Sequence, residues 1–136
     1  MSTFTAVVFD LDGTLIDSVP DVRAAVNRVL QEIGRPPLSL EDIKGMIGEG
    51  AQVMLKQVME KTGGYSPGME EEYLPRFLAT YKAHPADHTV VYPGVFEVLE
   101  QLEADGISLG LCTNKPSATT LPALEALGLN KYFESI

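Results

Sequence analysis

Two short apolar runs, each followed at once by polar residues, stand out along the chain. Ala6 to Phe9 precedes Asp-Leu-Asp-Gly-Thr at 10–14, and Ile107 to Thr113 precedes Asn-Lys-Pro at 114–116. A short apolar run that ends in turn residues is typical of a buried strand in a parallel sheet. Ligands of open α/β sheets bind at the carboxyl ends of such strands. The pattern therefore predicts two parallel strands with polar residues on the ligand-binding side.

The stretch between the two runs has helical periodicity. Apolar residues spaced by three and four predict a first helix that Gly34 ends, and Ser18 and Asp21 have the S-x-x-D spacing of a capping box. Ser39 and Asp42 repeat that spacing before a short helix. A third helix is predicted over 51–61, and a fourth around 73–81, where a proline at 75 must kink the helix or lie in its first turn.

Helical pattern also surrounds the second apolar run. A helix from Val95 ends at Asp105-Gly106, and a last helix over about 117–127 ends at Gly128. Residues 134–136 have the character of a further strand. The order predicts an α/β core, formed by residues 1–16 and 89–136, with an inserted helical cap at 17–88.

Composition narrows the class of protein. The 136 residues carry a formal charge of −9, which argues against nucleic acid as a partner because phosphate backbones require basic patches. No apolar stretch is long enough to cross a bilayer, and the first residues lack the features of a signal peptide. The single cysteine, Cys112, excludes an internal disulfide, and its apolar run predicts a core position. We expect a cytoplasmic protein with no membrane partner.

Asp10 and Asp12 are the first candidates for chemistry. Two carboxylates at the end of a buried strand repel one another, and a hard divalent cation such as Mg²⁺ would neutralise them. Gly13 permits a tight turn and the close approach of a ligand to the backbone. The alternative is a solvated turn, since Asp and Gly are common turn residues.

Thr113 and Asn114 end the second predicted strand. A hydroxyl and a backbone N–H there, close to the start of the following helix, could hold phosphate oxygens. Lys115 could add positive charge to the same phosphate site, or it could be an exposed lysine at the start of a helix.

These residues resemble the signatures of the haloacid dehalogenase superfamily of phosphatases. Phe-Asp-Leu-Asp-Gly-Thr-Leu at 9–15 is similar to the first signature, and Thr113-Asn114 is similar to the second. Five further stretches are similar to phosphoglycolate phosphatases, at 16–21, 36–39, 47–51, 92–95 and 113–116. The resemblance covers the whole chain and implies a Rossmann-like core with a parallel sheet and an α-helical cap.

The resemblance also implies a reaction and its residues. Asp10 would attack phosphorus and form an aspartyl-phosphate, and Asp12 would act as acid and then as base. Mg²⁺ would bind the Asp10 carboxylate and the backbone carbonyl of Asp12. Gly13, Thr113, Asn114 and Lys115 would hold the phosphoryl group of a small phosphorylated metabolite. The carboxylic acid of Asp12 counts against halide displacement, because a halide leaves without a proton.

A loop between two predicted helices, Gly48-Glu49-Gly50, is similar to the family's substrate-facing loop. A plain turn between helices is the alternative. Glu49 is a poor choice to meet an anionic substrate unless it points away, so the backbone amides of the loop are better candidates.

Two further signatures of the family, a lysine and an acidic pair that completes the metal site, have no counterpart in the 136 residues. The first strand would then form an exposed apolar edge, so we expect a fragment of a longer enzyme whose own activity is doubtful. Three functions remain open: a phosphoglycolate phosphatase-like hydrolase, a sugar-phosphate mutase similar to β-phosphoglucomutase, and a non-catalytic module. The sequence does not define the oligomeric state.

Overall fold

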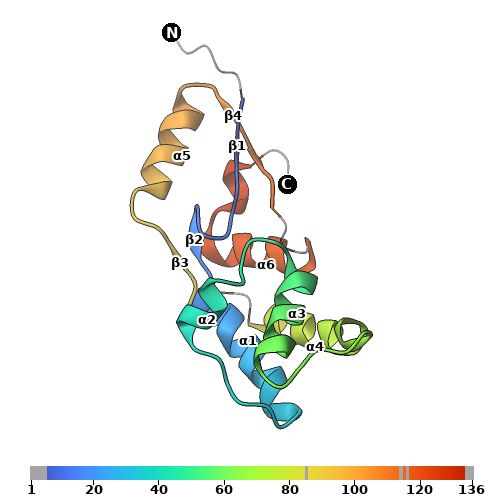
Figure 1. Cartoon of the computed structure of the whole chain (residues 1–136). Helices are drawn as coiled ribbons and strands as arrows, with labels where there is room; N and C mark the ends of the chain where they lie inside the picture. Colours follow the sequence, from blue (N-terminus) through green and yellow to red (C-terminus); the bar gives the residue numbers. More distant parts are fainter. Residues whose placement is uncertain (1–5, 85, 114, 116, 134–136) are drawn as a thin grey trace.

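The computed structural model describes residues 6–84, 86–113, 115 and 117–133. Strands β1 (Ala6–Phe9) and β4 (Ser108–Leu111) pair in parallel, with Ala6 opposite Ser108 and Phe9 opposite Leu111. Helices α5 (Val95–Ala104) and α6 (Ser117–Leu127) accompany this pair, as Figure 1 shows in orange and red. The predicted parallel α/β arrangement is therefore confirmed for the described residues.

We call these elements the sheet group. After α6 the chain forms a 3-10 turn, η1 (Asn130–Tyr132). Apolar side chains of the segment after β1, of β4, of both helices and of the region around η1 form one buried cluster. Its members are Leu11, Leu15, Ile16, Leu99, Leu109, Leu111, Leu124, Leu129, Tyr132 and Phe133. Residues 134–136, for which a strand was predicted, lie outside the described residues.

Four helices form a second group, which we call the helical group. They are α1 (Val19–Glu32), α2 (Leu40–Lys44), α3 (Ala51–Lys61) and α4 (Met69–Ala83). Their apolar faces meet in a cluster separate from that of the sheet group: Val22, Ala25, Val26, Val29, Leu30, Leu38, Ile43, Met54, Leu55, Val58, Phe77 and Tyr81. All four predicted helices are thus present, while the division of the chain into domains at 17 and 88 stays a prediction.

A small antiparallel pair that the sequence did not predict joins the two groups. Strand β2 (Ile16–Asp17) leads from the sheet group into the helical group, and β3 (Val90–Val91) leads back. Ile16 lies opposite Val91 and Asp17 opposite Val90, and the Tyr92 N–H donates to the Leu15 carbonyl at 3.0 Å. Both crossings between the groups therefore run side by side (Figure 1).

The two predicted capping boxes have opposite outcomes. Ser39 accepts from the backbone N–H of Asp42, and Asp42 accepts from that of Ser39, which confirms the box at α2. The box predicted at α1 is wrong, because Ser18 makes no side-chain cap bond. Ser18 instead donates to Asp12, and Asp21 accepts from His88 and Thr89. Long-range partners of both side chains replace the local ones.

The positions of a cysteine, a proline and a valine show how the structure compares with further predictions from the sequence. Cys112 is exposed, so its predicted core position is wrong: strand β4 ends one residue earlier. Pro75 is the seventh residue of α4 and lies in the interior of the helix rather than in its first turn. Val8 is 65% exposed, in keeping with the apolar edge expected for the first strand. Among the described residues, no helix combines the length and apolar character that a membrane crossing requires.

Candidate active site

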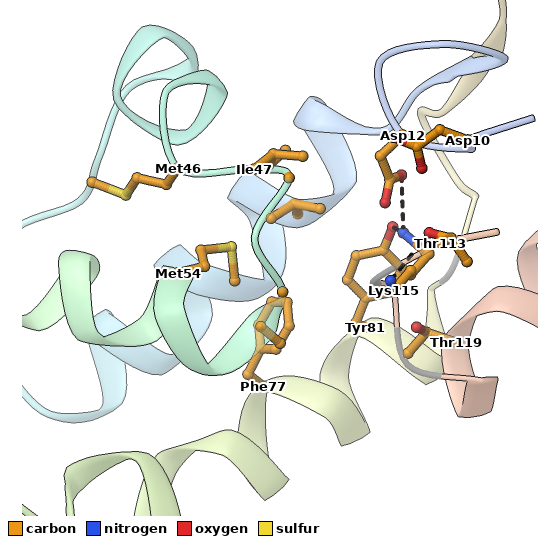
Figure 2. A pocket seen from close by; sticks show the side chains of 14 residues that line it. Asp10, Asp12, Met46, Ile47, Met54, Phe77, Tyr81, Thr113, Lys115 and Thr119 are labelled. Atoms are coloured by element: carbon orange, nitrogen blue, oxygen red, sulfur yellow. Dashed lines mark hydrogen bonds and ion pairs between the residues drawn. The ribbon is translucent and has the colours of Figure 1, made fainter.

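The in-register pairing of β1 and β4 brings their polar ends together. The Cys112 N–H donates to the Phe9 carbonyl at 2.8 Å, which extends the pairing by one step beyond Leu111. Asp10 and Asp12 follow the first strand, and Thr113 and Lys115 follow the second. All four side chains meet at this end of the sheet and line one cavity (Figure 2). Asn114, another predicted phosphate ligand, lies outside the described residues, and Gly13, the fourth, is not among the residues that line this cavity.

A tight loop after β1 fixes the two carboxylates. The backbone N–H groups of Thr14, Leu15 and Ile16 all donate to the Leu11 carbonyl, and the Gly13 N–H donates to the Ile16 carbonyl at 2.9 Å. Gly13 has a φ of +79°, and a side chain there would meet open space. Backbone conformation rather than crowding within the protein therefore favours glycine at this position.

Asp10 and Asp12 have different surroundings. Asp10 is exposed, and its Oδ1 accepts the backbone N–H of Leu11 at 2.8 Å. The side chain of Asp12 is 16% exposed, and its Oδ1 accepts from the Ser18 hydroxyl at 2.6 Å and from the Lys115 ammonium at 3.3 Å. One carboxylate is open to a ligand, whereas the other is held between a hydroxyl and a cation.

Lys115 is not the exposed helix-start lysine that the sequence also allowed. Its side chain is 5% exposed, and its ammonium contacts Asp12 on one side and Tyr81 of α4 on the other (Figure 2). The Tyr81 hydroxyl accepts a hydrogen bond from Nζ, and Nζ also lies 4.3 Å from the centroid of the Tyr81 ring. The Lys115 N–H donates to Thr113 Oγ1 at 3.1 Å, which fixes the backbone of the loop.

Burial and charge act on both partners of this contact. Burial lowers the pKa of Lys115, while the neighbouring charges of Asp12 and Asp21 act in the opposite direction. Burial also raises the pKa of Tyr81, and the charges of Asp12 and Asp21 raise it further. Burial and neighbouring charge therefore act in the same direction on the pKa of Tyr81 and in opposite directions on the pKa of Lys115.

The cavity that these residues line is small and has an apolar wall on the side of the helical group. Its volume is about 60 Å³. Opposite the carboxylates, the wall consists of Val22, Met46, Ile47, Ala51, Met54 and Phe77. The predicted substrate loop contributes Gly48 and Gly50, while Glu49 is exposed and lines no part of this cavity. A ligand on Asp10 would thus meet backbone and apolar side chains there rather than a carboxylate.

The donor set for a metal is incomplete within the described residues. Carboxylate and carbonyl oxygens at Asp10 and Asp12 suit a hard divalent cation. Within that part of the chain, however, no group of three or more His, Cys, Asp or Glu side chains is arranged to hold a metal ion. The Asp10 carboxylate and the Asp12 backbone carbonyl would supply two oxygen ligands to such a cation, and its other ligands would come from other groups.

Sequence reasoning missed two contributors to this site. Ser18 was taken as a helix cap and Tyr81 as packing on an apolar helix face, yet both contact the Asp12–Lys115 pair. The hydroxyl of Tyr81 on an otherwise apolar face was the available signal. No sequence signal distinguishes Ser18 from an ordinary cap, because its spacing from Asp21 matches a capping box.

Comparisons with known proteins agree with this geometry. Residues 7–136 match the family model described as haloacid dehalogenase-like hydrolase. The chain is 44% identical over 131 residues to a phosphoglycolate phosphatase of Cereibacter sphaeroides, covering 96% of this chain and 60% of that protein. A phosphoglycolate phosphatase of Pseudomonas putida is 42% identical over 135 residues, with 96% of this chain and 48% of that protein covered.

Solved structures give the same fold. A predicted phosphoglycolate phosphatase from Haemophilus somnus superposes with a TM-score of 0.91 at 30% identity, covering 99% of this chain and 62% of that one. CbbY from Rhodobacter sphaeroides, at 18% identity, shares the fold with a TM-score of 0.81, covering 98% of this chain and 63% of that one. This chain thus spans about half to two thirds of the length of these relatives. On the family match and the fold together, the chain belongs to the haloacid dehalogenase-like hydrolases.

Proposed function

We propose that the protein is a Mg²⁺-dependent phosphate monoester hydrolase that acts through an aspartyl-phosphate on a small substrate such as 2-phosphoglycolate. One observation carries this proposal: an exposed carboxylate, Asp10, stands two residues before a carboxylate, Asp12, that a hydroxyl and an ammonium hold in place. The similarity to phosphoglycolate phosphatases supports the choice of substrate.

Asp10 is the proposed nucleophile. Its exposed carboxylate can approach phosphorus, and the Leu11 N–H on Oδ1 orients the group. An oxygen of Asp10 bonds to phosphorus as the bond from phosphorus to the leaving oxygen breaks. The displacement is thus divided into two steps through a covalent carboxylate intermediate.

Asp12 is the proposed acid and base. It gives a proton to the departing oxygen and then takes one from the water that attacks the aspartyl-phosphate, so that phosphate and free Asp10 result. Ser18 and Lys115 both donate to Oδ1, which leaves Oδ2 as the oxygen to carry the proton. A fixed carboxyl group is suited to proton transfer at a defined point in the cavity.

The phosphoryl oxygens require positive charge or hydrogen-bond donors. Thr113 and Lys115 line the cavity beside Asp10, and Asn114 is a further proposed donor, whereas the Gly13 N–H already donates to the Ile16 carbonyl. Mg²⁺, held by the Asp10 carboxylate and the Asp12 carbonyl, would supply charge neutralisation for an anionic substrate in a protein of net charge −9.

A compact leaving group suits the cavity. Its volume is about 60 Å³, and apolar side chains form the wall opposite the carboxylates. Gly48 and Gly50 bring backbone to the wall of the cavity, and we propose that amides of this loop meet the leaving group. This is where a carboxylate such as that of phosphoglycolate would be recognised.

Phosphate release measured with and without Mg²⁺ tests the proposal. The substrates are 2-phosphoglycolate, β-glucose 1-phosphate and p-nitrophenyl phosphate, and Asp10→Asn is the variant of interest. Asp105→Asn, at the exposed end of α5, is the matched control. We expect activity that needs both Mg²⁺ and Asp10 and that is highest on 2-phosphoglycolate. Release that persists in Asp10→Asn would overturn the assignment of the nucleophile.

A further inference from the structure

A contact between the two groups of the fold lies directly behind the proposed acid and base. Tyr81 belongs to α4 in the helical group, and Lys115 belongs to the loop after β4 in the sheet group. Helix α4 also packs against α6, which follows this loop. The ammonium of Lys115 contacts both Asp12 and the hydroxyl of Tyr81 (Figure 2).

The chemistry of an ammonium explains why such a contact matters. A lysine side chain has many rotamers, and its ammonium is a compact charge with three N–H donors. Within the described part of the chain, Asp12 and Tyr81 take two of these donors, and the third remains for an anion in the cavity that Lys115 lines. Two hydrogen-bond partners restrict the ammonium to one place, whereas Asp12 alone would leave it free to rotate about a single contact.

Tyr81 is suited to this task for two reasons. It is 3% exposed and packs edge-on against Phe77 with ring centroids 5.7 Å apart, so its own position is fixed. Its hydroxyl oxygen also accepts a charge-assisted hydrogen bond from the ammonium.

We propose that Tyr81 is a positioning residue that holds the Lys115 ammonium beside Asp12 for the reaction. Tyr81 acts through Lys115 and does not itself touch the reacting atoms. The two residues come from different groups of the fold. The Lys115 ammonium therefore keeps its contact with Tyr81 only while α4 packs against the sheet group. The inference rests on the proposed function for its role in turnover, whereas the contact itself can be tested without activity.

The first test observes the ammonium directly. A buried, hydrogen-bonded lysine ammonium exchanges its protons slowly and gives a signal in a ¹H–¹⁵N correlation spectrum, and loss of that signal in Lys115→Met assigns it. We expect Tyr81→Phe to shift or broaden the signal strongly. Tyr73→Phe, on the same helix but outside the cavity, is the matched control and should leave the signal in place. A Lys115 signal that Tyr81→Phe leaves unchanged overturns the inference.

The second test separates positioning from simple support of the fold. Phosphate release is measured for wild type, Tyr81→Phe, Lys115→Met and the double variant. We expect Tyr81→Phe to lower kcat/KM about tenfold in the wild-type background and by less than about twofold in the Lys115→Met background, as loss of one charge-assisted hydrogen bond predicts. Equal losses in both backgrounds would show that Tyr81 acts independently of Lys115 and would overturn the inference.

Failure of the proposed function and failure of this inference have different signatures. Activity that survives Asp10→Asn would overturn the assignment of Asp10 as nucleophile. The spectrum of the Lys115 ammonium would still test whether Tyr81 positions it. If the chain shows no turnover, the spectrum alone decides it. A Tyr81→Phe variant that loses activity through unfolding is recognised by its thermal melt, and the spectrum of the folded fraction then gives the answer.

Discussion

Asp21 binds the backbone N–H of His88 with both carboxylate oxygens, at 3.0 and 2.9 Å. The Thr89 hydroxyl donates to the same carboxylate at 2.5 Å. Asp21 lies in the first turn of α1 and is 4% exposed, while His88 and Thr89 lie on the chain as it returns from α4 to β3. One buried carboxylate therefore joins the beginning of the helical group to its end.

Asp21→Asn should destabilise the fold. An amide has one acceptor oxygen in place of two and lacks the charge that strengthens these bonds, so we expect the free energy of unfolding to fall by about 2 kcal/mol. Urea denaturation measures the change. Asp87→Asn, on the same connection but with a side chain 53% exposed, is the control and should change stability by less than about 0.5 kcal/mol. Equal effects of the two substitutions would count against the role given to Asp21.

Ser18→Ala should reduce turnover. The serine is 2% exposed, and its hydroxyl donates a hydrogen bond to Asp12 instead of capping the helix, so its loss removes one of the two donors on Oδ1. We expect kcat to fall about tenfold, the effect of one hydrogen bond to a charged group. Steady-state kinetics of phosphate release provide the measurement. Ser66→Ala, at an exposed position before α4, is the control, and an unchanged kcat for Ser18→Ala would contradict the arrangement around Asp12.

The stabilisation from Asp42 should depend on pH. The Lys61 ammonium at 2.8 Å, together with the Ser39 backbone and hydroxyl, lowers the pKa of Asp42 from 3.8 to about 2. A lowered folded pKa means that the stabilisation is complete above the unfolded value and is lost as the pH falls through the folded one. The difference in urea midpoint between wild type and Asp42→Asn should therefore shrink between about pH 4 and pH 2.

Lys61→Met offers an internal check on that prediction. Lys61 is the largest cause of the lowered pKa, ahead of Ser39, so the pH-dependent difference should become smaller in its absence. High salt should have a similar effect, because both side chains are partly exposed and salt screens such pairs. A difference that stays constant down to pH 2 in the wild-type background would rule out this linkage.

Pro75→Ala should raise the stability of α4. The proline is exposed and lies inside the helix, where it removes a backbone hydrogen bond and crowds the preceding turn. We expect a gain of about 1–2 kcal/mol from restoring the helical bond, visible as a higher Tm. Pro20→Ala tests the opposite case, since Pro20 occupies the first turn of α1, where proline is favoured. It should be neutral or destabilising.

Helices were predicted well where the groups that define a helix start bond to each other within a few residues. The box formed by Ser39 and Asp42 is closed by backbone groups three residues away, and the sequence contains both partners. Ser18 and Asp21 have the same spacing but find partners in Asp12 and in His88, which lies 67 residues away. Sequence spacing cannot choose between a local and a distant partner of equal chemistry.

The candidate site was predictable only in part for the same reason. Asp10 and Asp12 follow an apolar strand, so strand pairing alone brings them to Thr113 and Lys115. The contact of Lys115 with Tyr81 depends on how α4 packs against the sheet group, which no pattern in either segment specifies. The exposure of Cys112 likewise follows from the residue at which β4 ends, and strand ends are the least reliable part of a prediction from sequence.

The pairing of β2 with β3 has a mechanical consequence. Two separate tethers between rigid bodies would permit twisting and sliding, but Ile16 and Asp17 are bonded to Val91 and Val90 across a ribbon. A ribbon of two short strands resists shear along its length and bends most easily across its face. A shift of one crossing past the other would break the backbone bonds of this ribbon, so the two crossings connect the helical group to the sheet group as one unit.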